Sequence, residues 1–167
     1  MSTDPNDPRT RIMGCLPAHT VLAFDFGLRR IGIAAGDTVT GRAAPRPAAS
    51  MLAKGPQWAA IDREVRELAP RWLVVGIPYN AAGGAGQLTA AARRFGSALR
   101  ERYGLDVQYV DERWSSLEAG ATLKRSRAEG SRPRRVRREH LDSAAAAVIL
   151  ERWFAGERVD TCRQTDR

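Results

Sequence analysis

The sequence contains few of the residues that build disulfide or zinc centres. Its 167 residues include two cysteines, Cys15 and Cys162, and two histidines. The cysteines have neither CxxC spacing nor a histidine cluster beside them, so we expect free thiols rather than a disulfide framework or a zinc site. The histidines have no evident partners, so the chain also lacks a serine–histidine–aspartate set for nucleophilic catalysis.

Long apolar runs are also missing. No run approaches the ~20 residues that a membrane-spanning helix needs. The first eleven residues are polar, contain two prolines and lack the apolar core of a signal peptide. We therefore expect no membrane association and a cytoplasmic location. We expect residues 1–19 to form a disordered or loosely attached arm, residues 20–156 one globular domain, and residues 157–167 a polar tail.

Positive charge is present, and it is concentrated in one segment. The formal net charge is +8, and residues 124–138 contribute +7 of it through eight basic residues and one acid. A local patch on a nearly neutral body indicates a docking surface, and nucleic acid is the anionic partner we expect. A solvated basic loop is the alternative. The predicted nucleic-acid contacts in this segment are Lys124, Arg125, Arg134, Arg135, Arg137 and Arg138.

Apolar runs and helical spacings alternate along the chain. The run 21–24 ends at Asp25, and a second run, 31–35, predicts a hairpin with it. A third strand over 42–48 contains two prolines, which favour an edge position. Further strands are predicted at 72–77 and 107–110, and helices at 58–68, 88–99 and 141–154. Ser115 or Ser116 is predicted to cap one more helix, with Glu118 placed to help. This order predicts an α/β fold whose sheet begins antiparallel and continues with parallel strands and helical crossovers.

Three carboxylates fall at the ends of these elements. Asp25 and Glu112 end two predicted strands, where α/β proteins usually bind ligands, and Asp142 lies in the first turn of the last helix. Neighbouring carboxylates repel one another, and a hard divalent cation relieves that repulsion. Two Mg²⁺ or Mn²⁺ ions ~3.5–4 Å apart can hydrolyse a phosphodiester without a nucleophilic side chain. Alternatively, Asp25 forms a turn, Glu112 pairs with Arg113, and Asp142 starts a helix.

Four stretches resemble the YqgF family of the ribonuclease H-like superfamily. This family is associated with pre-16S ribosomal RNA cleavage and is also called Holliday-junction-resolvase-like. The stretches occur in family order and span about 130 residues; they are LAFDFGLRRIGIAAGD (22–37), LVVGIPYNAAGGAG (73–86), VDERWSS (110–116) and HLDSAAAAVIL (140–150). The resemblance implies a ribonuclease H-like mixed five-stranded sheet flanked by helices, and metal-dependent phosphodiester hydrolysis.

The same resemblance implies roles for individual residues. It assigns Asp25, Glu112 and Asp142 to catalysis and to the binding of two Mg²⁺ or Mn²⁺ ions. Arg30 and Arg113 either contact phosphate or brace the acids. Glu139, three residues before Asp142, is either an auxiliary metal ligand or a surface acid paired with arginine.

The expected function is processing of the 5′ end of pre-16S ribosomal RNA, by an endonuclease or exonuclease that acts on structured nucleic acid. The alternatives are a Holliday junction resolvase that cuts branched DNA, and a non-catalytic protein that binds nucleic acid or a ribosome precursor. We expect a monomer or a weak homodimer, with Trp114 or Trp153 as candidates for a dimer face.

Other nucleotide-binding classes fit the sequence less well. The Asp25-Phe26-Gly27 triplet matches a kinase motif, but the remaining kinase motifs are missing. The glycine-rich stretch 79–86 is not followed by GK[ST], so it is not a P-loop. It is either a surface loop or a loop that contacts phosphate near the cleft. An actin-like ATPase needs two such domains, for which 167 residues are too few.

Overall fold

Within the described residues, the strands and helices follow the order that the sequence predicts, with one short strand added, and the helix expected to begin at Ser115 or Ser116 lies outside these residues. The computed structural model describes residues 18–78, 86–112 and 138–157, with side chains described from Ser143 onward in the last range. The elements are β1 (Thr20–Phe26), β2 (Arg30–Asp37), β3 (Ala43–Leu52), β4 (Gly55–Pro56), α1 (Trp58–Leu68), β5 (Trp72–Ile77), α2 (Gln87–Tyr103), β6 (Asp106–Asp111) and α4 (Arg138–Phe154).

The strands form one mixed sheet in the order β4-β3-β2-β1-β5-β6. β1 pairs antiparallel with β2 and parallel with β5, and β5 pairs parallel with β6. Five strands match the expected sheet, and the two-residue β4 extends it at the end of β3. The rest of β3 has only β2 as a described neighbour, which agrees with the edge position that its prolines favour.

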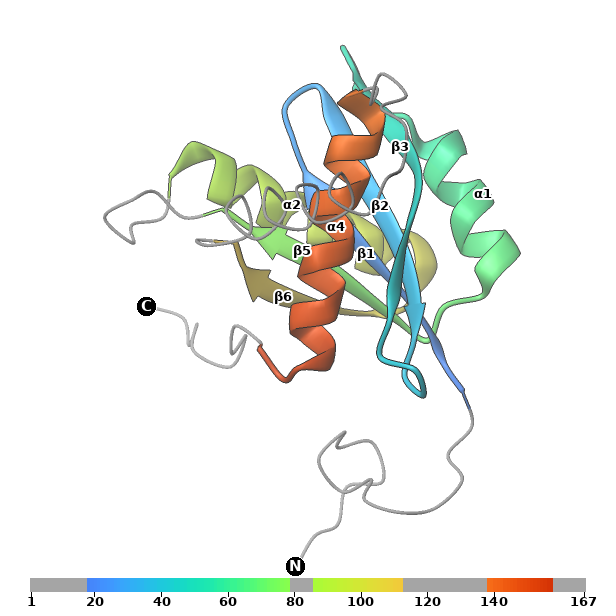
Figure 1. The fold of residues 1–167 in the computed structure, drawn as a ribbon. Coiled ribbons are helices and arrows are strands. Elements are labelled where there is room, and N and C mark those ends of the chain that lie inside the picture. The colour runs from blue at the N-terminus through green and yellow to red at the C-terminus, as the bar shows by residue number, and fades with distance from the viewer. Residues whose placement is uncertain (1–17, 79–85, 113–137, 158–167) are drawn as a thin grey trace, which may run out of the picture.

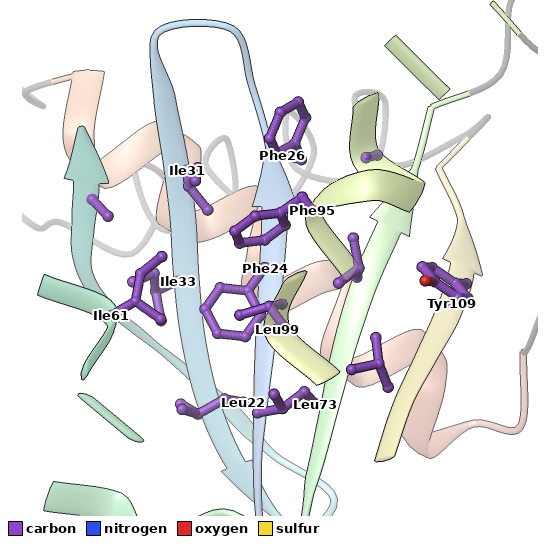
Figure 2. Close-up of a cluster of buried hydrophobic side chains, with 14 of the residues drawn as sticks. Leu22, Phe24, Phe26, Ile31, Ile33, Ile61, Leu73, Phe95, Leu99 and Tyr109 are labelled. Atoms are coloured by element: carbon purple, nitrogen blue, oxygen red, sulfur yellow. The ribbon is translucent and has the colours of Figure 1, made fainter. Parts of the chain in front are cut away.

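Helices cover both faces of the sheet (Figure 1). Alternate residues of β1 divide between two apolar clusters, because successive side chains of a strand point to opposite faces. Leu22, Phe24 and Phe26 pack with residues of α1 and α2, as the close-up in Figure 2 shows for Phe24, Phe95 and Leu99. Val21 and Ala23 instead pack with residues of α4. Asp25 therefore belongs to the face that α4 covers.

The helix ends agree with simple local signals. α1 ends at Leu68, before Ala69 in the left-handed conformation and Pro70. α2 ends before Gly104, whose φ of 63° suits glycine at this position. An ion pair joins these two helices: Arg102 binds both carboxylate oxygens of Asp62 at 2.7 Å. α4 begins at Arg138, three residues before the predicted start.

The last helix corrects one expectation. Trp153 does not lie on a dimer face, because its side chain is 3% exposed and packs against Val74 and Val110 of the sheet. Its Nε1 donates a hydrogen bond to Oε1 of Gln108 at 2.9 Å. Trp114, the other candidate, lies outside the described residues. Within the described ranges, no helix is both long and apolar enough to cross a membrane.

Candidate active site

Asp25 lies near the end of the central strand, on the face covered by α4. It pairs in register with Gly32 on β2 and with Gly76 on β5. Glycine on both sides leaves room around the carboxylate, because neither neighbour presents a side chain to it. The next residue, Phe26, turns to the opposite face and packs on Phe95 at a ring distance of 5.3 Å. This packing fixes the strand end that carries Asp25.

Glu112 reaches the same place from β6. The register aligns Gly76 with Val110, so Glu112 lies two residues beyond this pair and on the same face. Its backbone amide donates to the carbonyl of Ile77 at 3.0 Å, which continues the ladder by one step. Oε1 of Glu112 is shielded from solvent. The structure therefore brings Asp25 and Glu112, which are far apart in the chain, to one end of the sheet.

Gly76 is the surface on which the Glu112 side chain rests. A methyl group added at Gly76 would overlap the Glu112 carboxylate and the tip of Ile149. Any residue larger than glycine would thus displace either the carboxylate or the helix that covers it. The other residues of β5 are buried and apolar. Gly76, the one glycine of β5, lets the Glu112 carboxylate lie close to the backbone of this strand.

The two carboxylates perturb one another. Burial raises the pKa of Glu112 far above its ordinary value, and the negative charge of Asp25 and a hydrogen bond shared with it raise it further. Asp111 adds a smaller effect of the same sign, and Arg152 on α4 opposes it. Two acids that share a proton in this way carry one negative charge between them. Their carboxylate oxygens are also the kind of ligands that a divalent cation prefers.

The third predicted acid, Asp142, lies on α4, and its side chain is outside the described residues. Its position is seven residues before Ile149, which is two helical turns on the same side of the helix. The adjacent residue, Ser143, is 1% exposed, and its hydroxyl donates to the carbonyl of Arg46 on β3 at 2.6 Å. That bond attaches the beginning of α4 to the sheet. Glu139 also lies on α4 and also falls outside the described side chains.

The predicted basic contacts are described only in part. Arg30 begins β2, just after the turn that follows Asp25, and is half-buried. Arg138 begins α4, but its side chain lies outside the described residues. The same holds for the whole of Arg113, Lys124, Arg125, Arg134, Arg135 and Arg137.

The donor set fits a hard divalent cation. Asp25 and Glu112 offer carboxylate oxygens only, which are the ligands that Mg²⁺ and Mn²⁺ prefer. Their mutual repulsion and the raised pKa of Glu112 are relieved when a cation replaces the shared proton. Among the described side chains, no three acids, histidines or cysteines gather into a metal-binding group. A third ligand therefore has to come from elsewhere, and Asp142 is the candidate.

Three residues that shape this end of the sheet were missed by sequence reasoning. Gly76 had a signal, because an isolated glycine inside a strand marks a close approach. Thr89 is buried on α2, where its hydroxyl accepts from the amide of Gly86 at 3.3 Å and donates to the carbonyl of Pro78. It thereby joins Pro78, just before the glycine-rich stretch, to Gly86 at the end of that stretch. Neither Thr89 nor Arg152 had a local signal, because the role of each depends on tertiary packing.

A family model described as "RuvX: Holliday junction resolvase" matches residues 19–156. The chain belongs to the RuvX family. This membership confirms the resemblance carried by the four sequence stretches. Curated RuvX relatives include a "Putative pre-16S rRNA nuclease" of Xanthomonas euvesicatoria pv. vesicatoria (strain 85-10), 45% identical over 83% of this chain and 89% of its own length. Another protein of that name, from Xanthomonas oryzae pv. oryzae (strain PXO99A), is 46% identical over 84% of this chain and 90% of its own length.

A solved structure supports the fold of this RuvX chain. The structure titled "T. thermophilus RuvC in complex with Holliday junction substrate" matches 84% of this chain and 99% of its own, with a TM-score of 0.52 and 12% identity. At that identity the likeness concerns the fold alone. It confirms the predicted ribonuclease H-like α/β architecture, with its mixed sheet between helices.

Proposed function

We propose that this protein is a metal-dependent nuclease that hydrolyses phosphodiester bonds in structured RNA and processes the 5′ end of pre-16S ribosomal RNA. The observation that carries the proposal is the meeting of Asp25 and Glu112 at one end of the sheet, over Gly76. The names of the curated relatives support the RNA substrate. We propose the cytoplasm as the compartment and residues 20–156 as the catalytic unit.

In this proposal, Asp25, Glu112 and Asp142 hold two Mg²⁺ or Mn²⁺ ions, with Glu139 as an auxiliary ligand. Bound ions of this kind activate water and stabilise the leaving oxygen of a phosphodiester. The protein contributes the geometry: Gly76 leaves space for the Glu112 carboxylate, whose Oε1 is shielded from solvent. Arg30 and the basic segment 124–138 supply positive charge for the phosphate backbone.

Cleavage by the purified full chain tests the proposal. The panel contains a pre-16S RNA fragment, single-stranded RNA and a four-way DNA junction, each with Mg²⁺, with Mn²⁺ and with EDTA. We expect metal-dependent cleavage of the precursor fragment. Asp25→Asn should abolish cleavage and preserve binding, because it removes a metal ligand and no phosphate contact. Asp106→Asn is the matched control, since Asp106 is an exposed acid at the opposite end of β6.

The same panel separates the alternatives. The description of the family model favours a second candidate, resolution of Holliday junctions. Symmetric cuts in the junction, made by a dimer with the RNA left intact, would support that candidate. Binding without cleavage in every metal would support a non-catalytic role and exclude the nuclease. Product lengths distinguish an internal cut from stepwise removal of end nucleotides.

A further inference from the structure

Two hairpin tips lie side by side at the end of the sheet where β1 terminates (Figure 1). The β1–β2 tip consists of residues 27–30, and the β3–β4 tip consists of residues 52–55. The amide of Met51 donates to the carbonyl of Arg29 at 2.9 Å, which links the two tips directly. The tips therefore form one continuous surface next to the candidate active site.

Each tip exposes a leucine. Leu28 is 73% exposed and Leu52 is 55% exposed, and Val39 is the one other large hydrophobic residue that is exposed in the described part of the chain. A single exposed apolar side chain is ordinary on a protein surface. Here, two of the three gather at the end of the sheet that carries the carboxylates. Val39 lies at the opposite end, in the turn after β2.

The backbone that carries Leu28 is firmly held. The amide of Gly27 donates to the carbonyl of Arg30 at 3.0 Å, and a methyl group at Gly27 would overlap that carbonyl. On either side of the turn, Phe26 and Ile31 are buried in the core, as Figure 2 shows. The leucine is thus presented on a rigid turn. A side chain that separates stacked bases needs a fixed backbone, because a side chain on a mobile backbone would move aside and leave the bases stacked.

Positive charge flanks the two leucines. Arg29 and Lys54 are exposed and Arg30 is half-buried. Within the described ranges, none of the three forms an ion pair. The α-carbons of Leu28 and Asp25 are three residues apart, so at most about 11 Å separates them. That span corresponds to roughly three base steps of 3.4 Å.

We propose that Leu28 and Leu52 form an apolar wedge that enters between stacked bases beside the phosphodiester to be cut. Arg29, Arg30 and Lys54 hold the flanking phosphates. Leucine is among the residues that proteins insert between base steps, and the insertion unstacks the bases and bends the strand. The site then selects nucleic acid that unstacks readily, near a branch, a bulge or a helix end. The inference rests on the proposed function, because it requires nucleic acid at the carboxylates.

Fluorescence of 2-aminopurine tests the wedge, because this base brightens when it is unstacked. The probes are an RNA hairpin with a single-stranded flank and a four-way DNA junction, each labelled at the helix end or branch. The Asp25→Asn chain serves as the background, so that no probe is cut. We expect fluorescence to rise on binding of this chain. Adding Leu28→Ser and Leu52→Ser should remove the rise and weaken binding about ten-fold.

Two further variants sharpen the result. Val39→Ser removes an equally exposed apolar side chain at the far end of the sheet and should leave the signal intact. Leu28→Phe keeps an apolar wedge and should preserve the rise. A full rise with the double serine variant would overturn the inference. So would a change from dimer to monomer in sedimentation, which would make the tips an interface between two copies of the chain.

Failure of the inference is distinguishable from failure of the proposed function. If the wild-type chain cleaves with Mn²⁺ but the double serine variant unstacks the probe as well as its parent does, the wedge is wrong and the nuclease stands. If the wild-type chain neither binds nor cleaves any probe, both are wrong. Thermal unfolding of each variant shows that it is folded, and the exposed positions of both leucines make this the expected result.

Discussion

The carboxylate of Glu112 rests against the α-carbon of Gly76, on the strand between β1 and β6. This contact explains how two acids from non-adjacent strands meet. A residue with a side chain at position 76 would stand between Asp25 and Glu112. Glycine removes that barrier, and the Glu112 side chain folds back across the strand toward Asp25.

The first prediction concerns this glycine. Gly76→Ala should lower cleavage by at least about 100-fold, because the methyl group displaces the Glu112 carboxylate, and it should destabilise the fold by ~1–3 kcal/mol through overpacking against Ile149. Cleavage rates and urea denaturation measure the two effects. Gly86→Ala is the matched control, since a methyl group there meets nothing within 4 Å. Equal activity of the Gly76 variant and wild type would show that the position of Glu112 is not critical.

The second prediction concerns pH. In EDTA, the free energy of unfolding should fall as pH rises from about 4.5 toward 9, because the pKa of Glu112 is raised from 4.5 to about 9 in the folded protein. The folded state holds a proton that the unfolded chain releases, so this contribution is present at low pH and lost at high pH. Denaturation with urea at several pH values in this range should show this progressive loss of stability. Glu112→Gln should remove most of that slope, and an unchanged slope would contradict the assignment.

The third prediction concerns the bond between Ser143 and Arg46. Ser143→Ala leaves the partly buried carbonyl of Arg46 without this donor, which should cost about 1–2 kcal/mol. Because Asp142 immediately precedes Ser143, we also expect the cleavage rate to fall more than substrate affinity does. Ser97→Ala is the control, as its hydroxyl bonds a carbonyl on the exposed side of α2. Loss of stability with normal cleavage would assign Ser143 a purely structural role.

The fourth prediction concerns the ion pair that joins β3 to α1. Nε of Arg46 lies 2.7 Å from Oε2 of Glu64, whose side chain is 2% exposed. Arg46→Met should cost about 3 kcal/mol, because it removes the nearer of two cations from a buried carboxylate and leaves only Arg63, whose Nε lies 3.8 Å from Oε1. Adding Glu64→Leu should recover part of the loss. Guanidinium denaturation of the single and double variants measures this coupling. Arg100→Met breaks the exposed pair with Asp106 and should change stability by less than ~1 kcal/mol.

The fifth prediction concerns the basic segment. Glutamine in place of four of its arginines should weaken nucleic-acid binding and reduce the slope of log affinity against log salt by about 3. The substituted residues are Arg134, Arg135, Arg137 and Arg138. A control variant removes the same charge from α1 and α2, at Arg63, Arg66, Arg94 and Arg100, and should keep the wild-type slope. If both variants lose the slope equally, total charge drives binding and the segment has no special role.

Strand ends and side-chain alternation made part of the site predictable. Asp25 and Glu112 each follow an apolar run, and parallel strands bring their carboxyl ends to one edge. Proline likewise marked β3 as an edge strand, and the spacing of Trp58, Ile61, Val65 and Leu68 gave α1. These features depend on residues close together in the chain. Local periodicity was therefore enough to predict these elements and the meeting of Asp25 with Glu112, whose catalytic roles stay a prediction.

Other features depend on contacts between distant elements. The burial of Trp153, the bond from Ser143 to Arg46 and the effect of Arg152 on Glu112 all follow from how α4 crosses the sheet. No periodicity specifies that crossing. Trp153 shows the consequence, since an aromatic residue near the end of a helix reads equally well as surface or core until the helix is placed.

The arrangement of β1, β5 and β6 also has a consequence for how the protein is made. A ribosome releases β1 early, but Glu112 emerges only after β6, and β5 must already lie between the two strands. A nascent chain that lacks its final third thus has one carboxylate and no partner for it. Asp25 and Glu112 can therefore meet only after the first two thirds of the chain, with all of β5 and β6, have been made.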